Sequence, residues 1–262
     1  MKRLLSVLLV AGSVGTSLLS PAFFRVEAAQ LPSPVKLSGT IDWEKSDEIV
    51  AQLRRGANQL TVSSYGGNER AAMAIGRIVV QRQVEVRVEG ACMSACAQYI
   101  LLPASPRAII EHGSVVGFHG SALALSGWSR RYFAAGEPYR TIFRSSQPIS
   151  AEADKLISNA RHKALLIGSF KALAPVCVEA LPTLRDHSPR VRTTYQFWIP
   201  SRAQLDRAGI KFSGYWPADA AEAARLARQH FKTGTSFAFG GSFESHLPSQ
   251  LPLCSARVRE LE

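Results

Sequence analysis

The chain has 262 residues, of which 46% are hydrophobic and 19% charged, and its formal net charge is +11 at pH 7. This length suits one domain with a sizeable core. The basic residues are dispersed, with no dense run beyond pairs such as Arg130-Arg131, so the sequence offers no nucleic-acid-binding motif. A basic surface of this kind would instead attract anionic lipid, lipopolysaccharide or acidic peptides.

The N-terminal residues predict a secretory signal. Lys2-Arg3 precedes an apolar run at 4–19, and a small-residue cleavage site follows at Val26-Glu27-Ala28. An uncleaved anchor is the alternative, but the run contains Gly, Ser and Thr and is shorter than the roughly 20 apolar residues that a membrane span prefers. We therefore expect residues 1–28 to be removed and the mature chain to be periplasmic or secreted, with no stable membrane span.

Hydrophobic periodicity predicts alternating strands and helices over the next ninety residues. The first expected helix is capped by Ser46 or Asp47 and stopped by Gly56, and the second is capped by Asn68. The strands are expected at 35–43, 59–64, 84–90, 108–110 and 114–118, with a buried helix at 95–102. This order, βαβαβαββ, predicts an α/β fold with a largely parallel sheet covered by helices.

The second half of the chain is less regular. Residues 121–147 show no clear period and are interpreted as a lid or docking segment, and residues 150–173 read as one long helix. Prolines punctuate a predicted linker, at Pro175, Pro182 and Pro189. A strand at 195–199, helices at 201–208 and 218–231, and an irregular tail at 233–262 complete the prediction. The domain is therefore expected to span 29–232, with its core at 35–120 and a helical or lid segment at 121–190.

A serine, a histidine and a Gly-Gly turn follow the ends of three predicted strands. Ser94 lies between a strand and a helix, His119 lies 25 residues later, and Gly66-Gly67 follow the second strand. A serine hydroxyl becomes nucleophilic when a neighbouring base takes its proton, and histidine suits that role near neutral pH. Backbone N–H groups at Gly66 or Gly67 and at Ala95 would hold the oxyanion. This set predicts acyl transfer.

Four cysteines in an exported chain allow two disulfides with three connectivities, among which the sequence does not choose. They are Cys92, Cys96, Cys177 and Cys254. A Cys92–Cys96 bridge would pin the turn that presents Ser94. Two buried thiols, or pairing with the other two cysteines, are the alternatives.

The same residues resemble a known family. The order Ser-x-Gly-Gly, helix, strand, Cys-x-Ser-Ala-Cys, helix, strands and Gly-Phe-His-Gly is similar to the Clp protease proteolytic subunit and the signal peptide peptidase A group. The resemblance covers residues 35–120 well and 195–210 weakly. It implies a ClpP/crotonase-like fold of repeated ββα-type units. It also implies that Ser94 is the nucleophile, that His119 is the base and that the Gly66-Gly67 turn forms part of the oxyanion hole. Self-association into a homo-oligomer is a further implication.

The chain departs from this pattern at the third catalytic group. The family places an aspartate before a strand and helix similar to residues 198–205, but here the matching stretch is Thr193-Thr194-Tyr195-Gln196-Phe197. Asp186 and Asp154 would reach His119 only if the intervening chain folds back. Thr194 or Gln196 would orient the imidazole more weakly, and loss of an orienting carboxylate can cost about 10⁴ in rate.

Other interpretations stay open at this point. Ser94 could serve only as a helix N-cap, and His119 could be a buried structural histidine. Cys92, Cys96, His112 and His119 have the side-chain types of a zinc site. The Trp128-Ser129-Arg130-Arg131-Tyr132 cluster could contact substrate or be an ordinary loop.

The prediction that best accounts for the motifs is an exported serine hydrolase, a peptidase with a Ser-His acyl-enzyme mechanism and a peptide or protein substrate. It requires no cofactor and no metal. The alternative is a catalytically inactive crotonase-like scaffold that binds a peptide or protein partner.

Overall fold

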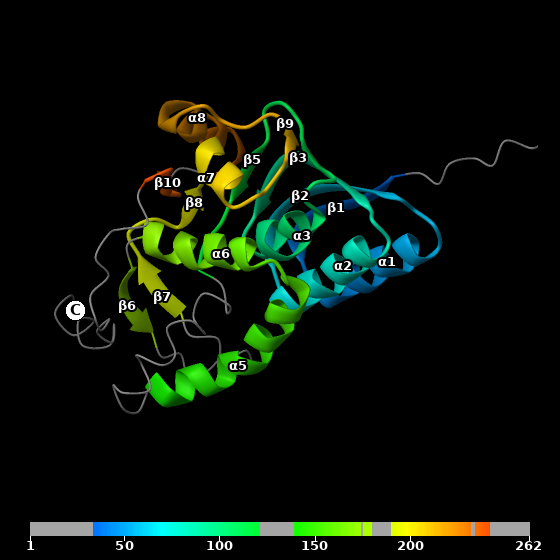
Figure 1. Cartoon of the computed structure of the whole chain (residues 1–262), viewed down its shortest axis with the longest axis horizontal. Coiled ribbons are helices and arrows are strands. Elements are labelled where there is room, and N and C mark those ends of the chain that lie inside the picture. Colours follow the sequence, from blue (N-terminus) through cyan, green and yellow to red (C-terminus); the bar gives the residue numbers. More distant parts are fainter. Residues whose placement is uncertain (1–33, 121–138, 174, 180–189, 232–233, 242–262) are drawn as a thin grey trace, which may run out of the picture. The chain divides into compact units, whose positions relative to one another are not determined.

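The computed structural model of the chain describes residues 34–120, 139–173, 175–179, 190–231 and 234–241 (Figure 1). The predicted signal at 1–28, most of the predicted lid and most of the predicted tail lie outside these residues. The same is true of the Trp128–Tyr132 cluster, of Asp186 and of Cys254. The side chain of Cys177 is also not described.

The centre of the fold is a six-stranded sheet in which every pairing is parallel. Its order is β1-β2-β3-β4-β9, and β5 also pairs with β3. The strands are β1 (Val35–Ile41), β2 (Gln59–Gly67), β3 (Glu85–Met93), β4 (Ala108–Ile110), β5 (Val115–Gly117) and β9 (Ser213–Gly214). Parallel strands that lie side by side need a crossover connection, which is usually a helix. The predicted α/β fold with a mostly parallel sheet is confirmed.

Helices α1 (Trp43–Arg54) and α2 (Glu69–Gln81) make two of these connections. The predicted cap of α2 is confirmed, since the Asn68 side chain accepts a hydrogen bond from the Ala71 N–H. The predicted cap of α1 is wrong, because α1 begins earlier and Asp42 accepts from the Lys45 N–H. Ser46 is instead buried within α1, and its hydroxyl donates to the Ala71 carbonyl at 2.9 Å, which ties α1 to α2.

Strand β3 does not end at Gly90 as predicted but continues to Met93. Gly90 adopts a φ of 103°, which glycine accepts without steric cost. The Ser114 hydroxyl accepts from the Gly90 N–H and donates to the Val88 carbonyl, each at 2.9 Å. These bonds satisfy the backbone of β3 where its partner changes from β4 to β5. The strand therefore bends without ending, and its last residue directly precedes Ser94.

The third connection is a buried π-helix, η1 (Cys96–Leu101), which continues into α3 (Leu102–Ala104). The side chains of η1 are fully buried against β3 and α2. A helix after Ser94 was predicted and is confirmed. π-helical turns are rare and are often found at functional sites.

Two predictions in the second half are wrong. The long helix at 150–173 is two helices, α5 (Tyr139–Leu156) and α6 (Ala160–Ala172). The break lies at Asn159, whose side chain accepts from the Arg161 N–H and thereby favours a new helix start. The proline-rich linker contains two antiparallel strands, β6 (Pro175–Glu179) and β7 (Arg190–Thr193).

The last described elements are β8 (Phe197–Ile199), α7 (Arg202–Arg207), α8 (Ala220–His230) and β10 (Phe237–Phe239). The capping box of Ser201 and Gln204 starts α7 near the predicted position. The expectation of an irregular tail is wrong for β10, which pairs in parallel with β8. Strand β8 is joined to the end of β5, because Phe118 and Trp198 exchange backbone hydrogen bonds of 2.8 and 2.7 Å.

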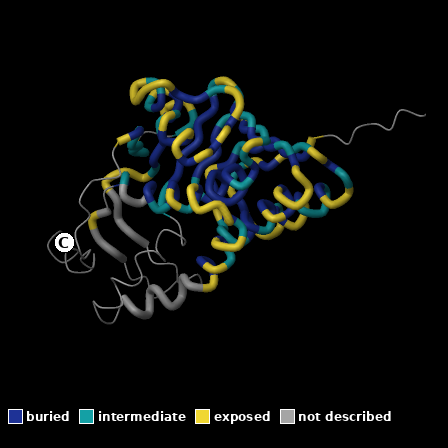
Figure 2. The backbone as a smooth tube through the Cα atoms, in the orientation of Figure 1, coloured by how far each residue is buried: buried dark blue, intermediate teal, exposed yellow. Residues whose placement is uncertain are grey.

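Burial follows the hydrophobic pattern of the sequence. The central strands and η1 are buried, whereas exposed residues lie on the outer faces of the helices and in turns (Figure 2). Among the described residues, no helix has the length and apolar character needed to cross a membrane.

Candidate active site

Ser94 is held at the junction of β3 and η1 in a conformation that few residues adopt. Its φ is 56°, in the left-handed region, which is uncommon outside glycine. Its N–H donates to the Gly117 carbonyl of β5, and its carbonyl accepts from the Gln98 N–H, both at 3.0 Å. Both backbone groups are thus fixed, and the sharp turn presents the side chain beyond the end of the sheet. Strained serine turns between a strand and a helix are found in known hydrolases.

The Ser94 hydroxyl and the His119 imidazole are in direct contact. Ser94 Oγ lies 2.5 Å from His119 Nε2, and both residues are half-buried. His119 directly follows Phe118, whose backbone is bonded to Trp198. Two predicted site residues 25 positions apart are therefore brought together, because β5 lies beside the C-terminal half of β3.

The hydrogen bonds of His119 define its tautomer. Its Nδ1 lies 2.7 Å from the Gly120 carbonyl oxygen, which can only accept, so Nδ1 carries the proton. In the neutral ring, Nε2 is then the acceptor and Ser94 Oγ–H is the donor. Burial lowers the pKa of His119, and the Gly120 carbonyl opposes this shift to a smaller extent. The pKa is lowered on balance, so a neutral imidazole faces the serine at neutral pH.

The backbone carbonyl of His119 is also bound, by two side chains that the sequence analysis did not select. Gln98 Nε2 donates to it at 2.5 Å, and the Ser169 hydroxyl of α6 lies 3.3 Å from it. Ser169 Oγ is nearer to the Leu166 carbonyl, at 2.7 Å, so Gln98 is the main partner. A signal for Gln98 was present in the sequence, since it is an amide four residues after Ser94 in an otherwise apolar helix.

The predicted Gly-Gly turn lies against the serine. A Cβ on Gly66 would stand 2.6 Å from Ser94 Cβ and 2.9 Å from Ser94 Oγ, and a Cβ on Gly67 would stand 2.3 Å from the Ile41 carbonyl oxygen. Both positions therefore require glycine. The Gly66 N–H donates to Ser64 Oγ at 3.1 Å. Of the predicted oxyanion donors, Gly67 and Ala95 remain.

Ala95 stands at the start of η1. It is the N-cap residue of this helix, and no side chain caps it. The first N–H groups of a helix lack intrahelical partners and carry partial positive charge. The interpretation of Ser94 as a mere N-cap does not hold, because its hydroxyl is directed to His119.

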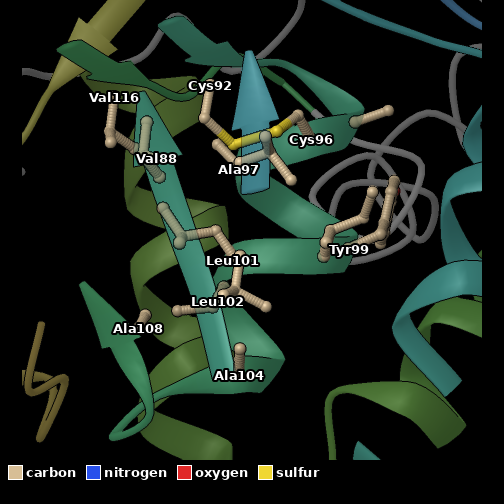
Figure 3. Close-up of a cluster of buried hydrophobic side chains, with 14 of the residues drawn as sticks. Val88, Cys92, Cys96, Ala97, Tyr99, Leu101, Leu102, Ala104, Ala108 and Val116 are labelled. Atoms are coloured by element: carbon tan, nitrogen blue, oxygen red, sulfur yellow. A yellow bond between two sulfur atoms is a disulfide. The ribbon is translucent and has the colours of Figure 1, made fainter. Parts of the chain in front are cut away.

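A disulfide joins Cys92 and Cys96, on either side of Ser94. The two Cα atoms are 5.3 Å apart, and both side chains are fully buried. Figure 3 shows the bridge beside the apolar side chains of β3 and η1. Of the cysteine pairings that the sequence left open, the bridge across the serine turn is the one formed, and it ties the last strand residues to the first turn of the helix.

The carboxylates considered for the third position are not seen at His119. Asp154 is exposed and forms an ion pair of 2.5 Å with Lys163, and Asp186 lies outside the described residues. Thr194 and Gln196 are exposed, and the Gln196 N–H donates to Ser236. Within the described chain, the recorded partner of His119 Nδ1 is the Gly120 carbonyl.

A cluster of partly exposed aromatic rings lies beside the pair. We name it the aromatic cluster, and it comprises Tyr65, Phe197, Phe231 and Phe237. Phe197 contacts the His119 ring, with centroids 5.7 Å apart, and Tyr65 precedes the glycine that touches Ser94. Phe231 and Phe237 also line a pocket of about 400 Å³, with Arg228 among its other residues. The sequence analysis missed this cluster because its members come from three segments that are distant in the sequence.

The residues considered for zinc do not converge. The two cysteines are bonded to each other, and the His112 ring packs against the Tyr215 ring, with ring centroids 4.8 Å apart. In the part of the chain that the structure describes, no group of three or more His, Cys, Asp or Glu side chains is arranged to hold a metal ion.

Comparison with known proteins adds no family assignment. No protein-family model matches this chain, and no curated protein matches it.

Proposed function

We propose that the protein is a serine hydrolase that cleaves peptide bonds through an acyl-enzyme. The observation that carries this proposal is the 2.5 Å contact of Ser94 Oγ with the unprotonated Nε2 of a half-buried His119. A nucleophile in hydrogen-bond contact with a base whose other nitrogen is fixed is the arrangement that covalent hydrolases use. The resemblance to ClpP/crotonase-like peptidases supports the same conclusion.

In the first step, Ser94 Oγ attacks the substrate carbonyl carbon while its proton moves to His119 Nε2. The resulting imidazolium then gives this proton to the leaving amine as the C–N bond breaks, and an ester to Ser94 remains. In the second step, water attacks the ester carbonyl carbon and gives a proton to Nε2. The imidazolium then returns this proton to Ser94 Oγ as the ester C–O bond breaks, and the acid product and free Ser94 form. The Gly120 carbonyl holds the Nδ1 proton in place throughout.

The tetrahedral intermediates need donors for their oxyanion. The Asn68 N–H donates to the Ile41 carbonyl of β1 at 2.9 Å. The Gly66 N–H donates to Ser64 Oγ, so the Gly67 N–H is the remaining donor between these two bonds on the turn that packs against Ser94. We assign the oxyanion hole to this N–H and to that of Ala95, at the positive end of η1.

A peptide or protein is the proposed substrate class. Phe197 of the aromatic cluster contacts the His119 ring and also Phe231, which lines the pocket. These apolar rings suit a large apolar side chain of the substrate. The apolar N-terminal run and the Cys92–Cys96 bridge support a periplasmic or secreted location. Assembly into a homo-oligomer is part of the proposal through the family resemblance alone.

Labelling with a fluorophosphonate, followed by intact mass, tests the proposal. We expect one adduct on the wild-type protein and none on Ser94→Ala or His119→Ala. The matched controls are Ser201→Ala, which changes a serine at the start of another helix, and His112→Ala. A folded wild-type protein that forms no adduct would overturn the proposal.

A second candidate is a crotonase-like scaffold that binds a peptide without cleaving it. The observation that favours it is the neutral carbonyl at His119 Nδ1, since a carbonyl fixes the tautomer but stabilises the imidazolium less than a carboxylate does. In that case Ser94→Ala would bind peptides as the wild type does, and neither would react with the probe.

A further inference from the structure

We propose that Gln98 is a positioning residue that holds His119 in its reactive orientation and takes over part of the role that an orienting carboxylate plays in other serine hydrolases. This inference rests on the proposed function. It concerns how the same site works when, among the described residues, a carbonyl is the partner of His119 Nδ1.

The first argument is geometric. Ser94 precedes η1 and Gln98 lies in its first turn, and the Gln98 N–H donates to the Ser94 carbonyl at 3.0 Å. Ser94 binds the His119 ring, while Gln98 binds the His119 backbone carbonyl at 2.5 Å. One turn of helix therefore holds the histidine at both its side chain and its main chain.

The second argument follows the covalent path from Gln98 to the imidazole. The His119 carbonyl belongs to the peptide plane between His119 and Gly120, so a donor on this oxygen fixes that plane. The next carbonyl, that of Gly120, accepts from Nδ1 at 2.7 Å. Loss of the Gln98 hydrogen bond would let this plane rotate. The Gly120 carbonyl, which fixes the tautomer and the orientation of the His119 ring, would then lose its position.

The third argument is that stability does not account for Gln98. Its side chain is fully buried among the apolar residues of η1. Its Oε1 has no hydrogen-bond partner in the described part of the chain. A buried amide with an unsatisfied oxygen is unfavourable relative to an apolar side chain of the same size. Departures of this kind are typical of functional sites.

The test compares Gln98→Met with Gln204→Met in the full chain. Both glutamines are buried and donate from Nε2 to a backbone carbonyl, at 2.5 Å to His119 and at 2.7 Å to Gly241. We expect Gln98→Met to slow fluorophosphonate labelling of Ser94 roughly 10- to 100-fold, the scale of a small misplacement of reacting groups. Gln204→Met should label at the wild-type rate, even where its melting temperature falls further.

A second readout follows the histidine itself. The Nδ1 proton of His119, observed by NMR, should exchange faster with water in Gln98→Met than in the wild type or in Gln204→Met. Gln98→Asn, which keeps an amide but is one methylene shorter, should show an intermediate labelling rate and replaces Gln98→Met if the latter does not fold.

Wild-type labelling rates and unchanged Nδ1 exchange in the Gln98 variants would overturn the inference. Equal losses in the Gln98 and Gln204 variants would also overturn it, since they would indicate a general effect of stability. Absence of labelling in the wild type would instead contradict the proposed function, and the exchange of the Nδ1 proton would still test the positioning role.

Discussion

Gly66 and Ser94 are packed so closely that Gly66 Cα has no room for a side chain on the side that faces Ser94. A methyl group there would lie 2.6 Å from Ser94 Cβ and 2.8 Å from the Met93 carbonyl oxygen. The turn after β2 and the turn after β3 are thereby fitted to each other, and the position of the serine depends on the absence of a side chain on its neighbour.

Gly66→Ala should therefore displace Ser94 and abolish labelling by a fluorophosphonate, with a fall of at least about 100-fold. The control is Gly56→Ala, because Gly56 also has a positive φ, 117°, but nothing lies within 4 Å of its added Cβ. Both variants carry backbone strain, and only the first carries a clash. Equal labelling of the two, measured by intact mass over time, would show that the contact is not required.

The pH dependence of labelling follows from the lowered pKa of His119. Because burial disfavours the imidazolium, the base stays neutral as the pH falls below the ordinary value of about 6.5. The labelling rate should be constant near neutral pH and fall with acidification, with its midpoint below 6.5. A midpoint at or above the ordinary histidine value, in a rate profile from about pH 4 to pH 8, would contradict the burial of the neutral base.

The same shift affects stability. The unfolded chain binds a proton at His119 at higher pH than the folded chain does, so this histidine lowers the free energy of unfolding as the pH falls through and below 6.5. Above that pH both states are neutral and the residue makes no such contribution. Urea denaturation at several pH values should show this loss in the wild type and less of it in His119→Gln.

Removal of the disulfide should affect the site more than the fold. The loop that Cys92 and Cys96 close is short, so its loss in Cys92→Ala/Cys96→Ala should lower the free energy of unfolding by about 2 kcal/mol. We expect labelling of Ser94 to slow as well, because the bridge spans the strained turn. The labelling rates of the wild type and the variant should be compared at urea concentrations where both proteins remain folded. An unchanged labelling rate in the variant would show that the bridge is not needed for the reactivity of Ser94.

The aromatic cluster should determine which peptides are cleaved. Phe231→Ala opens the pocket wall and should lower kcat/KM about tenfold for peptides with a large apolar side chain near the scissile bond, the scale of a lost apolar contact. Labelling by a small fluorophosphonate should be unaffected. Trp43→Ala removes an aromatic ring that is 48% exposed elsewhere, on α1, and should change neither measurement. Equal effects of the two substitutions would argue against a substrate pocket.

The sequence by itself determined the features that depend on neighbouring residues. The apolar periods placed β1 to β5 and the helices between them, and Asn68 marked the start of α2 because a cap acts over three residues. Ser94 was recognisable since a small polar residue stood between a strand and a buried helix, and parallel strands bring their ends to one edge of the sheet. His119 followed from the same rule.

Only the tertiary structure decided how these groups are oriented. Gln98 and Gly120 hold His119 through hydrogen bonds whose partners cannot be read from a local pattern. The Tyr65 hydroxyl donates to the carbonyl of His230, 165 residues away, and this contact belongs to the packing that builds the aromatic cluster. Such contacts depend on the path of the whole chain, because their energy is gained only when distant segments meet. Ser94 and His119 could therefore be predicted from the sequence, whereas their protonation, orientation and surroundings are determined by the tertiary structure.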